Sequence, residues 1–296
     1  MGLGAIKSAW QRQTLYFGHE RFDKYSVLVM DNQGMGESDK PLMRYSTSEM
    51  AHDVLEVLTH VGWVSSSGPQ NRSMHVIGLS LGGMIAQEVA CLIPDAISTL
   101  SLCCTAAQIE NTTTFTENLA KRASMLWPKS IENSVSGSGQ QMFPLSFLQA
   151  PDNAHLPDPK NMRNVLPPAP GAQYLHFETN YQRFVAQEMH KRLDPSRFGL
   201  RGFLLQLIAA GWHRKSPSQL KDMADKIGRE RILVMHGDDD GMISVPHGQK
   251  LIQYIEPGVG LILEGMGHVP IIERVEWYNN VLEKHVAQGE DMNGQN

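Results

Sequence analysis

The residues most able to do chemistry in this sequence surround one serine. Residues 76 to 84 read VIGLSLGGM, which places Ser80 in a G-x-S-x-G pattern between an apolar run and a helix-like segment. The backbone of a serine in such a strand-to-helix turn is strained, and small neighbours such as Gly78 and Gly82 allow strand and helix to approach. The turn lifts the hydroxyl above the carboxyl edge of a sheet, at the positive end of the next helix. The pattern therefore indicates a nucleophile.

A serine nucleophile needs a base, and the base needs an acid that orients it. Proteins with this turn carry the partners in the order serine, aspartate or glutamate, then histidine. Here RILVMHGDDDGMI places Asp238, Asp239 and Asp240 after one apolar run, and LILEGMGHVP places His268 after the next. The order fits, and small or flexible neighbours surround His268, as a mobile base requires. His236, just before the aspartates, is expected to be structural.

The elements that must position these residues are alternating strands and helices. Buried strands of a parallel sheet are predicted from apolar, β-branched runs at 26–30, 74–78, 97–104, 231–237 and 260–265. Helical patterns lie between them, and one begins with a capping box from Ser46 to Glu49. The alternation predicts an α/β fold, with a mostly parallel sheet and helices on both of its faces.

One long stretch, residues 106–215, interrupts the alternation, and no strand is expected in it. Residues 133–172 are rich in Pro, Gly, Ser and Asn and are expected to be loop-like, either ordered or disordered, whereas 173–213 looks helical. We interpret the stretch as a helical cap, inserted into a core formed by residues 1–105 and 216–296. The alternative is a disordered loop followed by two ordinary core helices.

Composition excludes several classes of function. The 296 residues carry a formal net charge of -5 without a basic block, which argues against nucleic acid as a partner. The apolar runs are too short for a membrane span. The three cysteines have no CxxC spacing and the twelve histidines no HxxxH pair, so neither a disulfide framework nor a metal site is expected. We expect a cytoplasmic protein; the oligomeric state stays open.

The chain resembles the α/β-hydrolases of the esterase, lipase and lactonase type. Four motifs carry the resemblance, namely GLSLGG around Ser80, DNQGMGESDKP at 31–41, HGDDD at 236–240 and GMGH at 265–268. The H-G-x-x-D spacing of the family selects Asp240 as the acid. The resemblance implies a triad of Ser80, His268 and Asp240 that hydrolyses a carboxylic ester, lactone or thioester of a small acyl substrate, with no metal or organic cofactor.

The resemblance also implies an oxyanion hole and raises a question about the sheet. The backbone N–H groups of Leu81 and Leu3 would bind the oxyanion, because MGLG at residues 1–4 resembles the family's HG-x-G loop. In the family that loop follows strands, one of them in the middle of the sheet, and these are expected to be missing here. A shortened sequence, or a true short form that is unstable or inactive, would explain this.

Three functions stay open at this stage. The first is hydrolysis of an ester, lactone or thioester. The second uses the same triad for C–C bond hydrolysis or acyl transfer in a metabolic pathway. The third is a non-catalytic or truncated member of the family that binds a ligand. The presence of Ser80, Asp240 and His268 together favours the first two.

Overall fold

The centre of the protein is a parallel sheet of four strands. The computed structural model describes residues 1–65, 72–110, 130–163, 165 and 167–294. The strands are β1 (Met74–Leu79), β2 (Ile97–Cys103), β3 (Ile232–Gly237) and β4 (Val259–Leu263), and they lie side by side in that order. Every residue of β2 and β3 is buried, which explains why both are continuous apolar runs in the sequence. These four predicted strands are confirmed.

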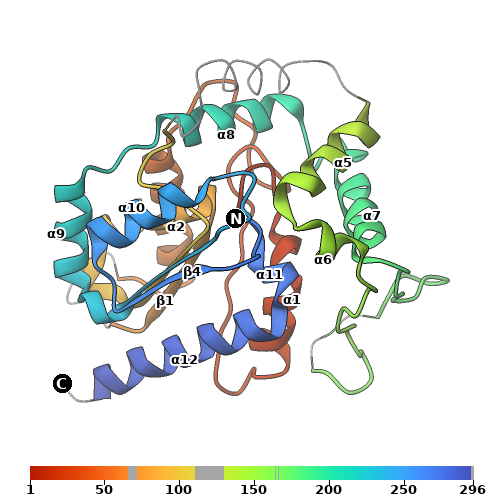
Figure 1. The fold of residues 1–296 in the computed structure, drawn as a ribbon. Coiled ribbons are helices and arrows are strands. Elements are labelled where there is room, and N and C mark those ends of the chain that lie inside the picture. Colours follow the sequence, from red (N-terminus) through yellow and green to blue (C-terminus); the bar gives the residue numbers. More distant parts are fainter. Residues whose placement is uncertain (66–71, 111–129, 164, 166, 295–296) are drawn as a thin grey trace.

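Helices cover both faces of the sheet (Figure 1). One face packs against α2 (Thr47–His60), α3 (Leu81–Leu92), α9 (Pro217–Ile227) and α10 (Val245–Ile255), partly through the short turns η3 (Pro94–Ala96) and η4 (Arg229–Arg231). The other face packs against α12 (Val275–Gly294), α11 (Pro270–Glu273) and the N-terminal turns η1 (Lys7–Trp10), α1 (Gln11–Gln13) and η2 (Thr14–His19). The predicted α/β class, with helices on both faces, is confirmed.

The predicted strand at residues 26–30 is wrong for this structure. The segment has no strand pairing, and Val27 and Leu28 are 40% and 36% exposed. Its apolar, β-branched composition favours a buried strand, but a strand exists only where a neighbour supplies a ladder of hydrogen bonds. In the described part of the chain no strand lies beside it.

The stretch from 106 to 215 contains helices and no strand among its described residues. They are α5 (Ile131–Met142), α6 (Leu145–Gln149), α7 (Asn180–Arg192) and α8 (Leu200–Trp212). Figure 1 shows α5, α6 and α7 grouped at one end of the molecule, with α8 crossing above the sheet. The helices expected within 173–213 are confirmed. Residues 111–129 lie outside the described residues, and the division into core and cap stays a prediction.

The loop-like character expected for residues 133–172 is wrong at its start, where α5 forms. The sequence IENSVSGSGQQM has weak helix propensity because of its serines and glycines. Its helix is supported by a cap, since Ser130 accepts a hydrogen bond from Asn133 N, and by packing against α7. A Cβ at Gly139 would lie 2.9 Å from the Phe184 ring, so glycine permits this close contact. Tertiary packing here overrides local propensity.

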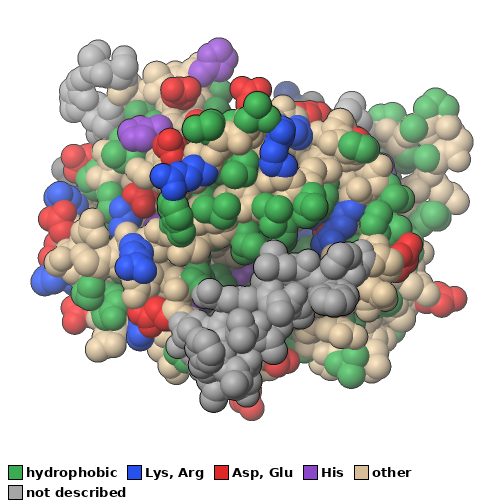
Figure 2. Space-filling view, turned by 90° about the horizontal axis from the view of Figure 1, so that it is seen from above, with side chains coloured by type: hydrophobic (Ala, Val, Ile, Leu, Met, Phe, Trp, Pro, Cys, Tyr) green, Lys and Arg blue, Asp and Glu red, His purple; other side chains and the backbone are tan. Residues whose placement is uncertain are grey.

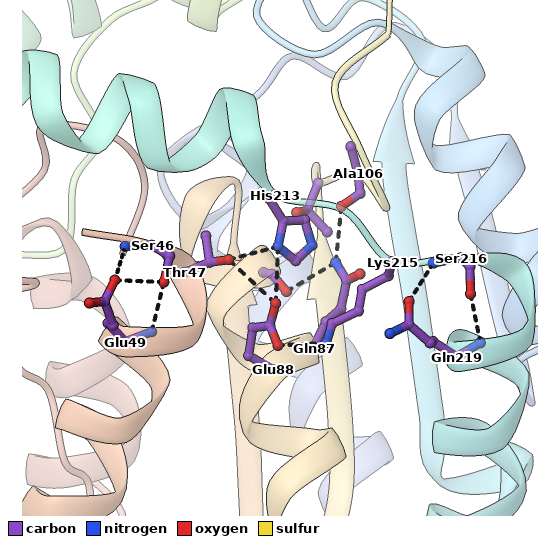
Figure 3. Close-up of polar contacts among 12 residues, drawn as sticks. Ser46, Thr47, Glu49, Gln87, Glu88, Ala106, His213, Lys215, Ser216 and Gln219 are labelled. Atoms are coloured by element: carbon purple, nitrogen blue, oxygen red, sulfur yellow. Dashed lines mark hydrogen bonds and ion pairs between the residues drawn. The ribbon is translucent and has the colours of Figure 1, made fainter. Parts of the chain in front are cut away.

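The two ends of this stretch meet on α3 (Figure 3). Lys215 N donates to Ala107 O at 2.9 Å, and Gln87 of α3 donates from Nε2 to Ala106 O at 3.1 Å. Glu88, one residue further along α3, forms an ion pair with Lys215 at 2.5 Å, and His213 Nδ1 lies 2.9 Å from Thr47 Oγ1. The same helix that begins at Ser80 therefore anchors both ends of the stretch.

The outer surface of α8 is apolar. Leu200, Leu204, Ile208 and Trp212 follow one another at four-residue spacing and are 37% to 68% exposed. Figure 2, which looks down on this side of the molecule, shows hydrophobic side chains gathered on the surface. Ala209 and Gln206 face the interior, so α8 presents apolar groups outward while it packs inward.

None of the described helices combines the length and the apolar character that crossing a bilayer requires.

Candidate active site

Ser80 occupies the turn between β1 and α3 in a strained conformation. Its φ is 57° and its ψ is -122°, an unfavourable region for a residue with a side chain. The strain expected from the sequence is confirmed. A Cβ at Gly78 would lie 2.6 Å from the Cα of Gly83, so strand and helix approach too closely for any larger residue. Ser80 N donates to Cys103 O at 3.0 Å, and Thr105 Oγ1 donates to Ser80 O at 2.7 Å, which hold the turn in place.

Asp240 is the aspartate that contacts His268. Its Oδ1 accepts hydrogen bonds from Met242 N and Ile243 N, each at 2.8 Å, and its Oδ2 accepts from His268 Nδ1 at 2.6 Å. Burial opposes ionisation, but the imidazoles of His268 and His236 together hold the pKa of the carboxyl well below its usual range. Asp240 is therefore ionised and fixed in orientation.

The two aspartates before Asp240 make other contacts. Asp238 and Asp239 are exposed, and Asp238 Oδ1 accepts from Gly265 N at 2.7 Å. Asp239 N donates to Met266 O at 3.1 Å. Both contacts support the loop after β4 and neither reaches the imidazole of His268, so the structure separates the three aspartates by position.

His268 lies in the loop after β4, and one nitrogen of its ring is hydrogen-bonded to Asp240. A carboxylate only accepts hydrogen bonds, so Nδ1 carries the proton that it shares with Asp240, and the Nε2 of the neutral ring is an acceptor. His268 N donates to Met142 O at 2.7 Å, and Gly267 N donates to Glu273 Oε2 at 2.8 Å. The loop is therefore held by the end of α5 and by α11.

Two further side chains adjoin this pair. His236, expected to be structural, is fully buried in β3; its Nε2 donates to Ile243 O at 2.7 Å and lies 3.3 Å from Asp240 Oδ2. Cys104 follows β2 with a φ of 45°, and its Sγ lies within 4.8 Å of the Asp240 and His268 ligand atoms. Thiol, carboxylate and imidazole could in principle hold a metal. Burial, however, raises the pKa of Cys104 well above its usual value and disfavours the thiolate that binds metals.

Ser80 and His268 lie at the same edge of the sheet without a direct bond. Ser80 N donates a hydrogen bond to Cys103 O, and Cys104 N donates one to Met235 O at 2.9 Å. These backbone hydrogen bonds connect the carboxyl ends of β1, β2 and β3 in a row. Among the hydrogen bonds of the described residues, none links the Ser80 hydroxyl to His268. Such catalytic contacts are often long before substrate binds. Ser80 is 7% exposed and His268 is 4% exposed.

Residues 1–4 lie against Ser80. A Cβ at Gly2 would be 3.6 Å from Ser80 Cβ, and the loop is held on two sides. Asn32 Nδ2 donates to Met1 O at 3.1 Å, and Gly4 N donates to the side chain of Gln206, on α8, at 2.9 Å. Within the described part of the chain, no acceptor is found for the N–H of Leu3 or of Leu81. The assignment of these two groups to an oxyanion hole stays a prediction.

Comparison with known sequences identifies relatives of this chain. A model of the alpha/beta hydrolase family matches residues 2–281. The chain is 32% identical over 107 residues to 3-oxoadipate enol-lactonase 2 of Acinetobacter baylyi. The matched residues make up 36% of this chain and 36% of that protein. It is 34% identical over 265 residues to the dihydrolipoyllysine-residue acetyltransferase component of the acetoin cleaving system of Pseudomonas putida, covering 88% of this chain and 56% of that protein. The matches thus span less than two thirds of either relative.

Solved structures share the fold at low identity. An enol-lactonase from Burkholderia xenovorans LB400 superposes with a TM-score of 0.65 and 18% identity, covering 97% of this chain and 88% of that one. A meta-cleavage product hydrolase from Pseudomonas fluorescens IP01 superposes with a TM-score of 0.67 and 17% identity, with the same coverage of 97% and 88%. At these identities the likeness concerns the fold.

Proposed function

Because the chain belongs to the alpha/beta hydrolase family, we propose that it is a serine hydrolase that cleaves a carboxylic ester, lactone or thioester. Ser80 is the nucleophile, His268 the general base and acid, and Asp240 the orienting carboxylate. The observation that carries the proposal is the strained Ser80 turn at the sheet edge that also holds the 2.6 Å contact between Asp240 and His268. A structural role alone would not require a serine in a conformation that disfavours side chains.

The reaction is acyl transfer in two halves. Ser80 Oγ attacks the carbonyl carbon while His268 Nε2 takes the hydroxyl proton, and the tetrahedral intermediate forms. His268 then gives that proton to the leaving alcohol or thiol, which leaves an acyl-serine. Water, deprotonated by the same nitrogen, attacks the acyl carbon, and Ser80 regains its proton as the acid departs. Asp240 keeps the Nδ1 proton in place and stabilises the charged ring throughout.

The oxyanion is assigned to the backbone N–H groups of Leu81 and Leu3. Leu81 N is at the start of α3, where the helix dipole favours negative charge. Leu3 belongs to the loop that lies against Ser80 and is anchored by Gln206 and Asn32. Loss of one oxyanion donor typically costs about 2.7–4 kcal/mol of transition-state stabilisation, so the position of residues 1–4 is important for the rate.

The substrate is proposed to be a small acyl compound, and the described helices α5 to α8 are proposed to form a cap over it. Similarity to proteins named as enol-lactonases supports an ester or lactone. A second candidate is acyl transfer or C–C bond hydrolysis on the same triad. It is favoured by the similarity, over 88% of the chain, to a protein named as an acetyltransferase component. Both candidates need the same three residues.

The experiment compares wild type with Ser80→Ala on a short p-nitrophenyl ester and with a fluorophosphonate probe. We expect wild type to turn over the ester and take up the probe, and Ser80→Ala to lose about 10⁴-fold or more of kcat with its urea midpoint retained. Probe uptake without ester turnover would favour the second candidate. If Ser80→Ala and His268→Ala both remain active, or wild type takes up no probe, the proposed triad is wrong.

A further inference from the structure

The buried side-chain amide of Gln206 joins three separate parts of the chain. Gln206 lies on the side of α8 that faces the interior, and it is fully buried. Its Oε1 accepts a hydrogen bond from Gly4 N at 2.9 Å, and its Nε2 donates to Gln33 O at 2.8 Å. One side chain therefore links α8, within the proposed cap, to the loop of residues 1–4 and to the loop that contains Gln33.

The backbone N–H of Gly4 depends on this side chain for its hydrogen bond. Gly4 is buried, and within the described part of the chain Gln206 Oε1 is the one acceptor found for its N–H. The carbonyl of Gln33 differs, because it also accepts from Tyr45 Oη at 2.9 Å. Removal of the Gln206 amide would thus leave Gly4 N unpaired, while Gln33 O would keep one donor. A buried N–H without an acceptor is costly, so the loop of residues 1–4 would shift to pair it.

Both loops pack closely against α8 around Gln206. A Cβ at Gly4, whose φ is 65°, would lie 2.8 Å from the ring of Phe203, so the backbone of this loop lies directly against α8. A Cβ at Gly202 would collide with Gly34 O, so the second loop approaches the same helix just as closely. The side chain of Gln206 therefore bonds both loops where they already contact α8.

Gly4 is adjacent in sequence to a residue proposed for the oxyanion hole. Leu3 and Gly4 are the two central residues of a tight turn, which is closed by a backbone hydrogen bond of 3.2 Å between the residues on either side. A Cβ at Gly2, in the same turn, would lie 3.6 Å from Ser80 Cβ. Because neighbouring peptide units share one Cα, a bond that fixes Gly4 N also restricts the direction of Leu3 N–H. Gln206 thus acts one residue away from a proposed oxyanion donor.

We propose that Gln206 is a positioning residue for the reaction, whose amide holds the turn at Leu3 and Gly4 where Leu3 N meets the oxyanion. Gln206 touches no reacting atom and acts through the backbone of residues 1–4. Since Gln206 belongs to α8, the proposed cap and the oxyanion position are directly joined. This role rests on the proposed function, because an oxyanion forms only if Ser80 attacks a carbonyl carbon.

The test compares Gln206→Leu and Gln206→Glu with wild type on a short p-nitrophenyl ester. Leucine offers neither an acceptor to Gly4 N nor a donor to Gln33 O, so kcat should fall by about 10²-fold, while KM should change little. Glutamate still presents an oxygen to Gly4 N, so the kcat of Gln206→Glu should exceed that of Gln206→Leu by about tenfold or more. Its buried carboxyl should lower the urea midpoint. An equal loss of kcat in both variants, or no loss in Gln206→Leu, would overturn the proposal.

Two further measurements separate positioning from a loss of stability. An alkyl trifluoromethyl ketone forms a tetrahedral adduct with a nucleophilic serine and carries an oxyanion, so its affinity should fall in Gln206→Leu by about the same factor as kcat/KM. Amide exchange in residues 1–5 should become about tenfold faster or more in Gln206→Leu.

Gln13→Leu is the matched control for the loss of a buried glutamine. Gln13 is 5% exposed and donates to Ile271 O at 3.0 Å and to Asn279 Oδ1 at 3.1 Å. Gln13→Leu should therefore lower the urea midpoint, because it leaves buried acceptors without this donor. Its kcat, its affinity for the ketone and amide exchange in residues 1–5 should stay as in wild type.

The outcomes separate a failure of this role from a failure of the proposed function. A wild type that takes up no fluorophosphonate would overturn the proposed function, and the role of Gln206 with it. A wild type that takes up the probe, together with a Gln206→Leu variant that keeps its kcat, ketone affinity and amide exchange, would overturn the role of Gln206 alone. A loss of kcat in Gln206→Leu with unchanged ketone affinity would also overturn it, because the loss would then not arise at the oxyanion.

Discussion

Single residues in the sheet edge differ sharply in what they contact, although they are adjacent in sequence. Asp238, Asp239 and Asp240 follow β3, but Asp240 is buried and turned toward His268 while the first two are exposed. The Asp240 carboxylate accepts two backbone N–H bonds besides the imidazole bond. These contacts fix which oxygen faces the histidine, so the environment of the carboxylate supports its proposed role as the orienting acid.

A prediction at this scale concerns the three aspartates. Asp240→Asn should lower kcat on a p-nitrophenyl ester by about 10⁴-fold, because an amide in that position favours the wrong tautomer of His268. Asp238→Asn should lower it far less, since that side chain bonds Gly265 N and not the imidazole. The measurement is kcat and KM for each variant, with urea midpoints as the control for folding. A larger loss in Asp238→Asn at unchanged stability would show that the acid is misassigned.

The sequence predicted the residues of the candidate site to different degrees. Ser80 could be recognised because a strained turn demands glycines at fixed spacing. The H-G-x-x-D spacing singled out Asp240, the aspartate that contacts His268 in the structure. The proximity of Cys104 to this pair, and the contact of His236 with Asp240, could not be predicted. The first depends on the side-by-side placement of β2 and β3, and the second on the tight turn after β3, where His236 and Asp240 are four residues apart.

At the scale of elements, a buried ion pair between Glu88 and Lys215 joins the proposed cap to the core. Glu88 of α3 and Lys215, just before α9, have side chains only 14% and 8% exposed. Burial raises the pKa of Glu88, but the bonds to His213 and Lys215 outweigh it, so the net shift is downward. This pair fixes the end of residues 106–215 to the helix that begins at Ser80 (Figure 3).

A prediction at the scale of elements follows from that burial. Glu88→Gln should lower the free energy of unfolding by about 3 kcal/mol, because it leaves the Lys215 ammonium buried without its partner. Adding Lys215→Met should recover part of this loss, since the double variant buries no unpaired charge. Urea unfolding of both single variants and the double variant gives the coupling. Strictly additive losses would mean that the two side chains do not interact.

Whether an element could be predicted from the sequence depends on whether its local pattern agrees with its surroundings in the fold. Strands β1 to β4 are apolar runs that also find neighbours, so pattern and environment agree. Residues 26–30 have the pattern without the neighbour and form no strand. Helix α5 is the reverse case, because it has poor propensity but packs on α7. Local patterns therefore fail where the deciding partner is distant in sequence.

At the scale of the whole molecule, we expect acid to lower the stability, because buried carboxylates have lowered pKa values in the folded protein. Asp240 is one of them in the core, and Asp152 is another within residues 106–215. The Asp152 side chain is fully buried, accepts from Phe177 N at 2.8 Å, and lies 2.6 Å from Arg183 Nη2. Burial raises its pKa, but the bond from Arg183 and the backbone bonds outweigh this and lower it to about 2.

The sign of the pH dependence follows from that lowered pKa. The pKa of Asp152 falls from 3.8 when unfolded to about 2 when folded, so its stabilisation is complete above pH 3.8 and is lost as the pH falls through about 2. The difference corresponds to about 2 kcal/mol. Asp152→Asn should therefore lower the urea midpoint at pH 7 and show a shallower decline between pH 4 and pH 2 than wild type. Asp222→Asn, at an exposed position on α9, is the matched control and should follow wild type at every pH. If the urea midpoints of Asp152→Asn and wild type fell in parallel below pH 4, the pKa of Asp152 would not be lowered in the folded protein.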